Sequence, residues 1–102
     1  MNAQIKKGIL EMCILYLVSQ EDMYGYTIMK KMSKYFPEVN ESTFYSILRR
    51  LNKENATETY IGEVSNGPKR KYYRITKSGE LYLKQNINSW RQINNVVNDI
   101  VY

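Results

Sequence analysis

The most continuous apolar stretch of the chain lies near its N-terminus and predicts a helix over residues 4–19. Its apolar side chains at helical spacing and on the sides between them are Ile5, Ile9, Leu10, Met12, Cys13, Ile14, Leu15, Tyr16, Leu17 and Val18. A helix that is apolar nearly all round is usually buried on more than one side. We therefore expect this helix either to form the centre of the domain or to face another subunit along part of its length.

Two shorter amphipathic helices are predicted next, over about 25–36 and 41–54. Pro37 ends the first, because proline lacks the backbone N–H that a helix interior needs. Asn40 is a suitable N-cap for the second, and Asn55 suits the left-handed conformation often found at a helix end. The short connection between them requires the second helix to cross closely over the first, which predicts a helix-turn-helix.

The helix predicted over 41–54 has an apolar face and a polar, basic face. The inward side chains at helical spacing are Phe44, Ile47, Leu48 and Leu51. The outer side chains are small and polar at first and basic later, namely Ser42, Thr43, Tyr45, Ser46, Arg49, Arg50 and Lys53. Small polar groups can approach base edges, and cations can hold phosphates. The pattern predicts a DNA-recognition helix, although the basic residues taken alone are equally consistent with a solvated helix face.

Residues 57–64 and 71–75 are predicted to form two short strands joined by a basic turn. Asn66-Gly67 suits the positive φ values of a tight hairpin turn. Three cations follow this turn closely, namely Lys69, Arg70 and Lys71. Such a ribbon is well shaped to lie against a phosphate backbone. The alternative is that the cations merely protect an exposed hairpin edge from pairing with other chains.

The last predicted helix spans about 77–101, with Thr76 as its cap. Its apolar stripe, in which three members recur every seven residues, consists of Leu83, Ile87, Trp90, Ile93, Val97 and Ile100. Little chain remains to cover this stripe. A seven-residue apolar repeat on a protruding helix is what a helix-to-helix dimer contact requires. These six residues are therefore the expected dimer interface.

The order of these elements predicts a mainly α fold with a small β-hairpin (α+β). Residues 1–76 would form a winged helix-turn-helix domain, and residues 77–102 a C-terminal dimerisation helix. Within the hairpin, strict alternation predicts that Tyr73 is on the opposite face from Tyr72.

Composition narrows the function further. The 102 residues contain 15 Lys and Arg against 10 Asp and Glu, and the net charge of +5 favours an anionic partner. The absence of histidine excludes histidine-based triads and His metal sites, and no Gly-rich phosphate loop appears, so we expect neither an enzyme nor a bound cofactor.

The apolar run is interrupted by Glu11 and is too short to span a bilayer. With no signal-peptide pattern and one cysteine, the chain is expected to be cytoplasmic.

Four motifs in order resemble the PadR family of bacterial transcriptional regulators. They are Tyr24-Gly25-Tyr26, Thr43-Phe44-Tyr45-x-x-Leu48-x-Arg50-Leu51, Gly67-Pro68-x-Arg70-Lys71-Tyr72-Tyr73-x-Ile75-Thr76, and Gly79 in the last helix. Trp90 falls where the family often has a tryptophan, and the length is similar to the short branch with a single C-terminal helix. The resemblance implies a homodimer that binds a pseudo-palindromic DNA operator, usually as a repressor.

Three positions depart from the family pattern. Ser42 stands where the family often has glycine, and Ser46 where it often has proline. Asn55 replaces a common glycine, which is mild because asparagine tolerates the left-handed conformation. The first two change the recognition surface, so the operator sequence cannot be carried over.

Several roles have two interpretations. Tyr24 either packs under the second helix or reaches the DNA backbone, and Tyr45 is expected near the surface with its hydroxyl available to a phosphate. Trp90 either fills the dimer contact or, as the resemblance implies for some members, stacks on a flat aromatic effector. Cys13 is either an inert buried thiol or a redox sensor. The alternative function is a winged-helix protein-interaction module, which predicts an apolar or acidic recognition helix instead.

Overall fold

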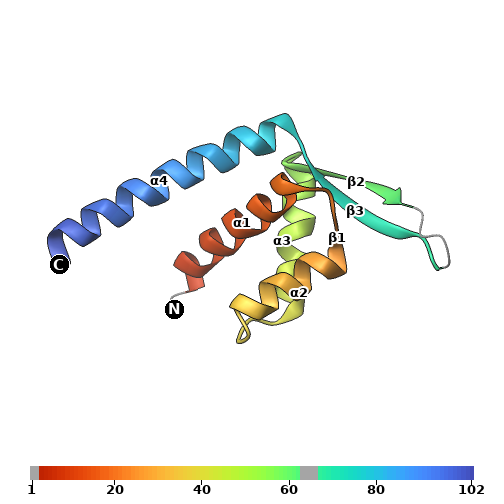
Figure 1. Ribbon diagram of the computed structural model, residues 1–102, viewed down its shortest axis with the longest axis horizontal. Coiled ribbons are helices and arrows are strands. Elements are labelled where there is room, and N and C mark those ends of the chain that lie inside the picture. Colours follow the sequence, from red (N-terminus) through yellow and green to blue (C-terminus); the bar gives the residue numbers. More distant parts are fainter. Residues whose placement is uncertain (1–2, 63–66) are drawn as a thin grey trace.

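The computed structural model describes residues 3–62 and 67–102, and it confirms a mainly α fold with a small antiparallel sheet (Figure 1). In chain order the elements are α1 (Ala3–Gln20), β1 (Met23–Tyr24), α2 (Gly25–Tyr35), α3 (Glu41–Lys53), β2 (Thr57–Gly62), β3 (Arg70–Ile75) and α4 (Lys77–Val101). The helices begin and end within about a residue of the predicted bounds. The predicted turn residue Asn66 and strand residue Val64 lie outside the described residues.

The core lies where α1, α2 and α3 meet. Ile14 and Leu15 of α1, Ile28 of α2, and Phe44 and Leu48 of α3 have no measurable exposure to solvent. Each such side chain contributes about 1.5–3 kcal/mol through removal from water. This burial confirms that α1 is the centre of the domain and that α3 turns its predicted apolar face inward.

The sheet has three strands, in the order β1-β3-β2, whereas the sequence pattern predicted a two-stranded hairpin. The additional strand, β1, pairs Met23 with Tyr73 and Tyr24 with Tyr72 of β3. A two-residue strand shows no alternation of its own and exists because β3 offers a free edge. Tyr73 is buried and Tyr72 half-buried, which agrees with the prediction that they lie on opposite faces of the hairpin.

The corner between α3, β2 and α4 depends on local backbone chemistry. Asn55 adopts a φ of 62°, the left-handed conformation expected at this helix end. The Thr76 hydroxyl donates to the Asn55 carbonyl at 2.6 Å and accepts the Gly79 N–H at 3.0 Å, which caps α4. Asn40 is the N-cap of α3, but its backbone carbonyl rather than its side chain accepts from the Thr43 N–H, at 3.0 Å.

Helix α4 begins inside the domain and leaves it (Figure 1). Leu83 is 6 % exposed and Ile87 packs against the core, whereas Trp90 is 42 % and Ile100 77 % exposed. The sequence predicted that the whole apolar stripe of α4 would be exposed within one chain. This is wrong for Leu83, whose side chain belongs to the core of the same chain. The protruding half gives the molecule its length of 55 Å against 30 and 20 Å in the other directions.

Candidate nucleic-acid interface

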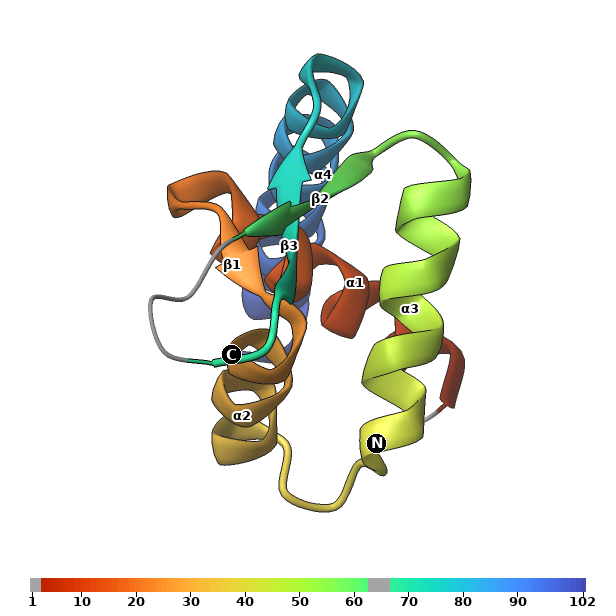
Figure 2. The ribbon, with the colours of Figure 1, turned by 90° about the vertical axis from the view of Figure 1, so that its right-hand side faces the viewer.

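The predicted recognition helix and the basic hairpin lie on the same side of the molecule. Figure 2 shows α2, α3 and the strands toward the viewer, with α4 running away behind the sheet. The fold therefore places α2, α3 and the strands on one side of the molecule, and the outer end of α4 on another.

The first half of α3 is open to solvent on its polar side. Ser42, Thr43 and Ser46 are all exposed, while Phe44 and Ile47 beneath them are buried. The anchored apolar face fixes how the three hydroxyl groups project. They lie at the helix N-terminus, where the helix dipole also favours an anion. This surface can approach both base edges and phosphates.

The basic half of α3 divides into exposed and tethered cations. Arg49 and Lys53 are exposed, as predicted. Arg50 is instead half-buried, and its guanidinium pairs with the carboxylate of Glu11 on α1. The prediction that Arg50 projects outward into solvent is therefore wrong. Its guanidinium pairs with α1 instead, because a buried carboxylate such as that of Glu11 requires a close cation.

Glu11 is a residue whose structural role sequence reasoning missed. It is 7 % exposed, and the pattern showed it merely as an interruption of an apolar helix. A hydrogen bond to Glu11 also raises the pKa of the Tyr82 hydroxyl on α4. Glu11 thus pairs α1 with α3, and together with Tyr82 it lines the groove between α1 and α4. A lone acidic residue among apolar ones was the available signal, since such a residue needs a partner.

Tyr45 is half-buried and packs against the core rather than standing clear of the surface. A Cβ on Gly25 would lie 3.7 Å from its ring, so the two helices of the helix-turn-helix meet closely here. Burial, first among several causes, raises the pKa of the Tyr45 hydroxyl. Like any tyrosine hydroxyl at neutral pH, this group is protonated and can donate a hydrogen bond.

A row of tyrosine rings crosses the outer face of the sheet. The Tyr60 and Tyr72 rings stack with centroids 5.7 Å apart, and the Tyr24 and Tyr72 centroids are 6.1 Å apart. The Arg70 guanidinium lies 4.8 Å from the Tyr24 centroid. An exposed cation–π contact of this kind contributes about 0.5–1 kcal/mol and restricts the arginine. Tyr24 thus packs on the sheet and beside Tyr26 of α2, with ring centroids 6.1 Å apart, and supports a cation of the hairpin.

The cations of the hairpin differ in what surrounds them. Arg74 pairs with Glu58 on the neighbouring strand at 3.0 Å, so its charge is locally balanced. Lys69, Arg70 and Lys71 are exposed near the end of the hairpin, and none forms an ion pair within the described residues. These three cations are therefore the ones available to a phosphate backbone.

A groove of about 540 Å³ runs between α1 and the outer half of α4. Its lining includes Ile9, Met12, Trp90, Ile93 and Val97, and it is mainly apolar. Cys13 is half-buried nearby on α1, and burial raises the pKa of its thiol. A thiol with a raised pKa is less reactive at neutral pH, which favours the inert interpretation of Cys13.

Residues 3–62 and 67–102 offer neither a membrane span nor a cluster of metal ligands. No helix in this part of the chain is long and apolar enough to cross a membrane. The same residues include no group of histidine, cysteine and acidic side chains that could hold a metal ion.

The chain is similar over most of its length to known regulators. The family model described as "Transcriptional regulator PadR-like family" matches residues 14–85. A PadR-like transcriptional regulator from Bacillus cereus has a solved structure that is 42% identical, with 97% of each chain covered and a TM-score of 0.87. A transcriptional regulator from Clostridium thermocellum is 33% identical, with 100% of this chain and 99% of that chain covered and a TM-score of 0.83.

A further relative is an uncharacterised protein of Lysinibacillus sphaericus. It is 36% identical over 99 residues, which cover 94% of this chain and 91% of that protein.

Proposed function

Because this chain belongs to the PadR-like family of transcriptional regulators, we propose that it is a homodimeric repressor that binds a pseudo-palindromic DNA operator. The family is one of regulators and not of enzymes. One observation carries the proposal: α3, which has exposed hydroxyl groups, and the hairpin of β2 and β3, which has exposed cations, both face the viewer in Figure 2. A regulator of this kind would act in the cytoplasm, where bacterial DNA lies.

The residues of α3 and those of the wing, which is the hairpin of β2 and β3, would make different kinds of contact with DNA. The exposed residues Ser42, Thr43 and Ser46 would approach base edges, with Tyr45 as a further donor. The phosphate contacts would come from cations on both elements, namely Arg49, Arg50, Lys53, Lys69, Arg70 and Lys71. Tyr24 would act indirectly, by supporting Arg70. Phosphate contacts position the protein, while base contacts select the sequence.

The outer half of α4 would form the dimer contact as a dimerisation helix over residues 77–102. Trp90, Ile93, Val97 and Ile100 are 42–77 % exposed on one protruding helix. A contiguous apolar surface of this kind is a typical protein-interaction site. A two-fold arrangement would cover both copies at once and pair two α3 helices with two half-sites. Leu83 and Ile87 would support this helix from inside the domain.

A binding assay across salt concentrations tests the DNA-binding proposal. The probe is duplex DNA from upstream of the protein's own gene, with an unrelated duplex of equal length as the control. We expect tighter binding to the first probe, and an affinity that falls as salt rises because Lys and Arg displace condensed counterions. Equal affinity for both probes, or affinity independent of salt, would contradict the proposal.

An aromatic effector that relieves repression is the second part of the proposal. Trp90 lines the groove between α1 and α4, where a planar compound could stack on the indole. If binding changed the angle between subunits, the separation of the α3 helices and the operator affinity would change together. Trp90 is the one tryptophan, so its fluorescence reports directly on titrated planar compounds, with and without DNA. Quenching without loss of DNA affinity would show binding without regulation, and no quenching would leave Trp90 as a packing residue.

A further inference from the structure

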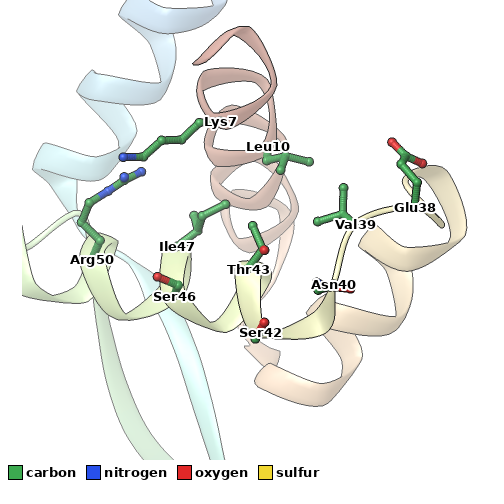
Figure 3. A pocket seen from close by; sticks show the side chains of 10 residues that line it. All are labelled: Lys7, Leu10, Glu38, Val39, Asn40, Ser42, Thr43, Ser46, Ile47 and Arg50. Atoms are coloured by element: carbon green, nitrogen blue, oxygen red, sulfur yellow. The ribbon is translucent and has the colours of Figure 1, made fainter. Parts of the chain in front are cut away.

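A second concave surface lies beside the recognition face, between α1 and the first part of α3 (Figure 3). This hollow has a volume of about 790 Å³. Most of its lining residues are polar or charged, and they come from α1, from the connection before α3 and from α3 itself: Lys7, Leu10, Glu38, Val39, Asn40, Ser42, Thr43, Ser46, Ile47 and Arg50. The hollow therefore shares its wall with the hydroxyl groups proposed to read DNA, and it adds residues that the sequence pattern did not indicate.

Two cations from different helices project into the same end of this hollow. Lys7 extends from α1 and Arg50 from α3, and Figure 3 shows both charged groups at the end away from Glu38. The hydroxyl of Ser46 lies one helical turn before Arg50, on the same wall. A lysine and an arginine that converge in this way are donors that suit the oxygen atoms of a phosphate.

The charges at this end do not cancel. Glu11 lies one turn after Lys7 on α1 and pairs with Arg50 from the buried side. Lys7 is exposed and has no ion-pair partner among the described residues. Two cations therefore face a single carboxylate, and the excess positive charge borders solvent. The paired Glu11 also restricts the Arg50 side chain, which lowers the entropy that binding would cost.

We propose that this hollow is a phosphate-binding site in which Lys7 and Arg50 together hold one phosphate of the DNA backbone. This inference rests on the proposed DNA-binding function and extends the interface from α3 and the wing to α1. Duplex DNA is the occupant that fits, because Ser42 and Thr43 on the same wall belong to the surface proposed to approach the bases. A phosphate held here would set the depth and register of α3 in the groove.

The test compares Lys7→Gln with a matched lysine-to-glutamine change on another surface. Lys84→Gln is the control, because Lys84 is an exposed residue of α4 and is not part of this hollow. Log affinity falls with log salt, and each lost phosphate contact makes this slope less steep by about 0.9. For a dimer with two such sites, the slope should become less steep by about 1.8. At about 0.1 M salt this corresponds to an affinity loss of roughly tenfold to a hundredfold. Lys7→Arg should retain both the affinity and the slope.

Neutral backbone linkages identify the phosphate itself. One methylphosphonate is moved along each half-site of the duplex, and affinity is measured for the wild type and both variants. We expect one position where the substitution weakens the wild type and Lys84→Gln but has no further effect on Lys7→Gln. Circular dichroism spectra that match the wild type would show that the variants are folded.

The outcomes separate this inference from the proposed function. If the wild type binds DNA with a normal salt dependence but Lys7→Gln and Lys84→Gln behave alike, the phosphate site is wrong and the DNA-binding function stands. If the wild type does not bind DNA, both fail. If inorganic phosphate raises the melting temperature of the wild type but not of Lys7→Gln, while the DNA affinities of the two are equal, the hollow holds a free anion, and the assignment to DNA is overturned.

Discussion

Arg50 pairs with the buried Glu11 on one side and borders solvent on the other. The pair offsets the cost of burying a carboxylate, and breaking it from either side would leave an uncompensated charge. Arg49 and Lys53 are exposed, and neither forms an ion pair with a buried group within the described residues. A charge change at Arg50 would therefore alter both the packing of α3 and any DNA contact, whereas a change at Arg49 or Lys53 would report on DNA binding alone.

Sequence preference should depend on the hydroxyl groups near the start of α3. Replacing Thr43 and Ser46 by alanine removes hydrogen bonds that contribute roughly 1 kcal/mol each, or about fivefold in affinity for the preferred operator. Other sequences should be affected less, so the ranking of operators changes. Replacing Lys69 and Arg70 by glutamine should instead weaken all sequences alike. Competition binding against a set of operator variants distinguishes the two results, and an unchanged ranking would place the base contacts elsewhere.

Gly79 should be intolerant of a side chain. A Cβ there would lie 2.0 Å from the backbone carbonyl oxygen of Ala56, so Gly79→Ala must displace α4 from the corner. We expect a loss of about 1–3 kcal/mol in the free energy of unfolding. Gly8→Ala is the control, because a Cβ on Gly8 meets nothing within 4 Å, and alanine in a helix is about 0.5–1 kcal/mol better than glycine. Urea unfolding followed by circular dichroism measures both, and similar midpoints would contradict the argument.

At the scale of the element, α4 has two halves with different environments. Gly79 and Leu83 belong to the core, while the surface from Trp90 onward is exposed. The same helix therefore completes one domain and extends beyond it. A truncation that tests dimerisation must accordingly end after Ile87, because removing Ile87 would also uncover part of the core.

The outer half of α4 should control the oligomeric state. Ile93→Glu with Val97→Glu places two charges in the proposed apolar contact, which costs several kcal/mol when the charges are unpaired. We expect folded monomers by light scattering, since Leu83 and Ile87 remain in place. Asn88→Glu with Asn95→Glu adds the same charge to the opposite side of the helix and should leave the dimer intact. Persistence of the dimer in the first variant would exclude this surface as the interface.

At the scale of the whole molecule, the elements proposed to bind DNA, α3 and the hairpin, lie away from the outer end of α4 (Figures 1 and 2). Two copies can therefore meet through α4 without covering α3 or the hairpin. A two-fold axis through the contact would direct both α3 helices toward one face of a duplex. The dimer contact and the DNA contact would then be linked, because the angle between subunits sets the separation of the two helices.

The spacing between half-sites should consequently be restricted. Half-sites bound by such a dimer lie about one DNA turn apart, so an insertion of five base pairs turns one of them to the opposite side of the duplex. We expect this insertion to reduce affinity toward that for a single half-site. Electrophoretic mobility with the natural and lengthened operators measures the effect. Equal affinity would indicate that each subunit binds independently.

Local features of the sequence were sufficient to determine the elements and the fold class. The apolar spacing from Phe44 to Leu51, the stop at Pro37 and the cap at Thr76 act over a turn or two of chain, so their effect is readable without a fold. The same holds for the polar first half of α3, whose outward position follows from its own apolar face. These features, together with the ordered motifs, also indicated the family.

Tertiary structure alone decided which distant residues meet. Glu11 and Arg50 are 39 residues apart and pair because α1 packs across α3. Strand β1 forms because β3 has a free edge. Leu83 is buried in the core, whereas Trp90 is exposed because a groove separates α1 from the outer half of α4. Lys7 faces the recognition helix for the same reason. Periodicity specifies which side of a helix is apolar, but the packing of the complete chain specifies what lies against that side.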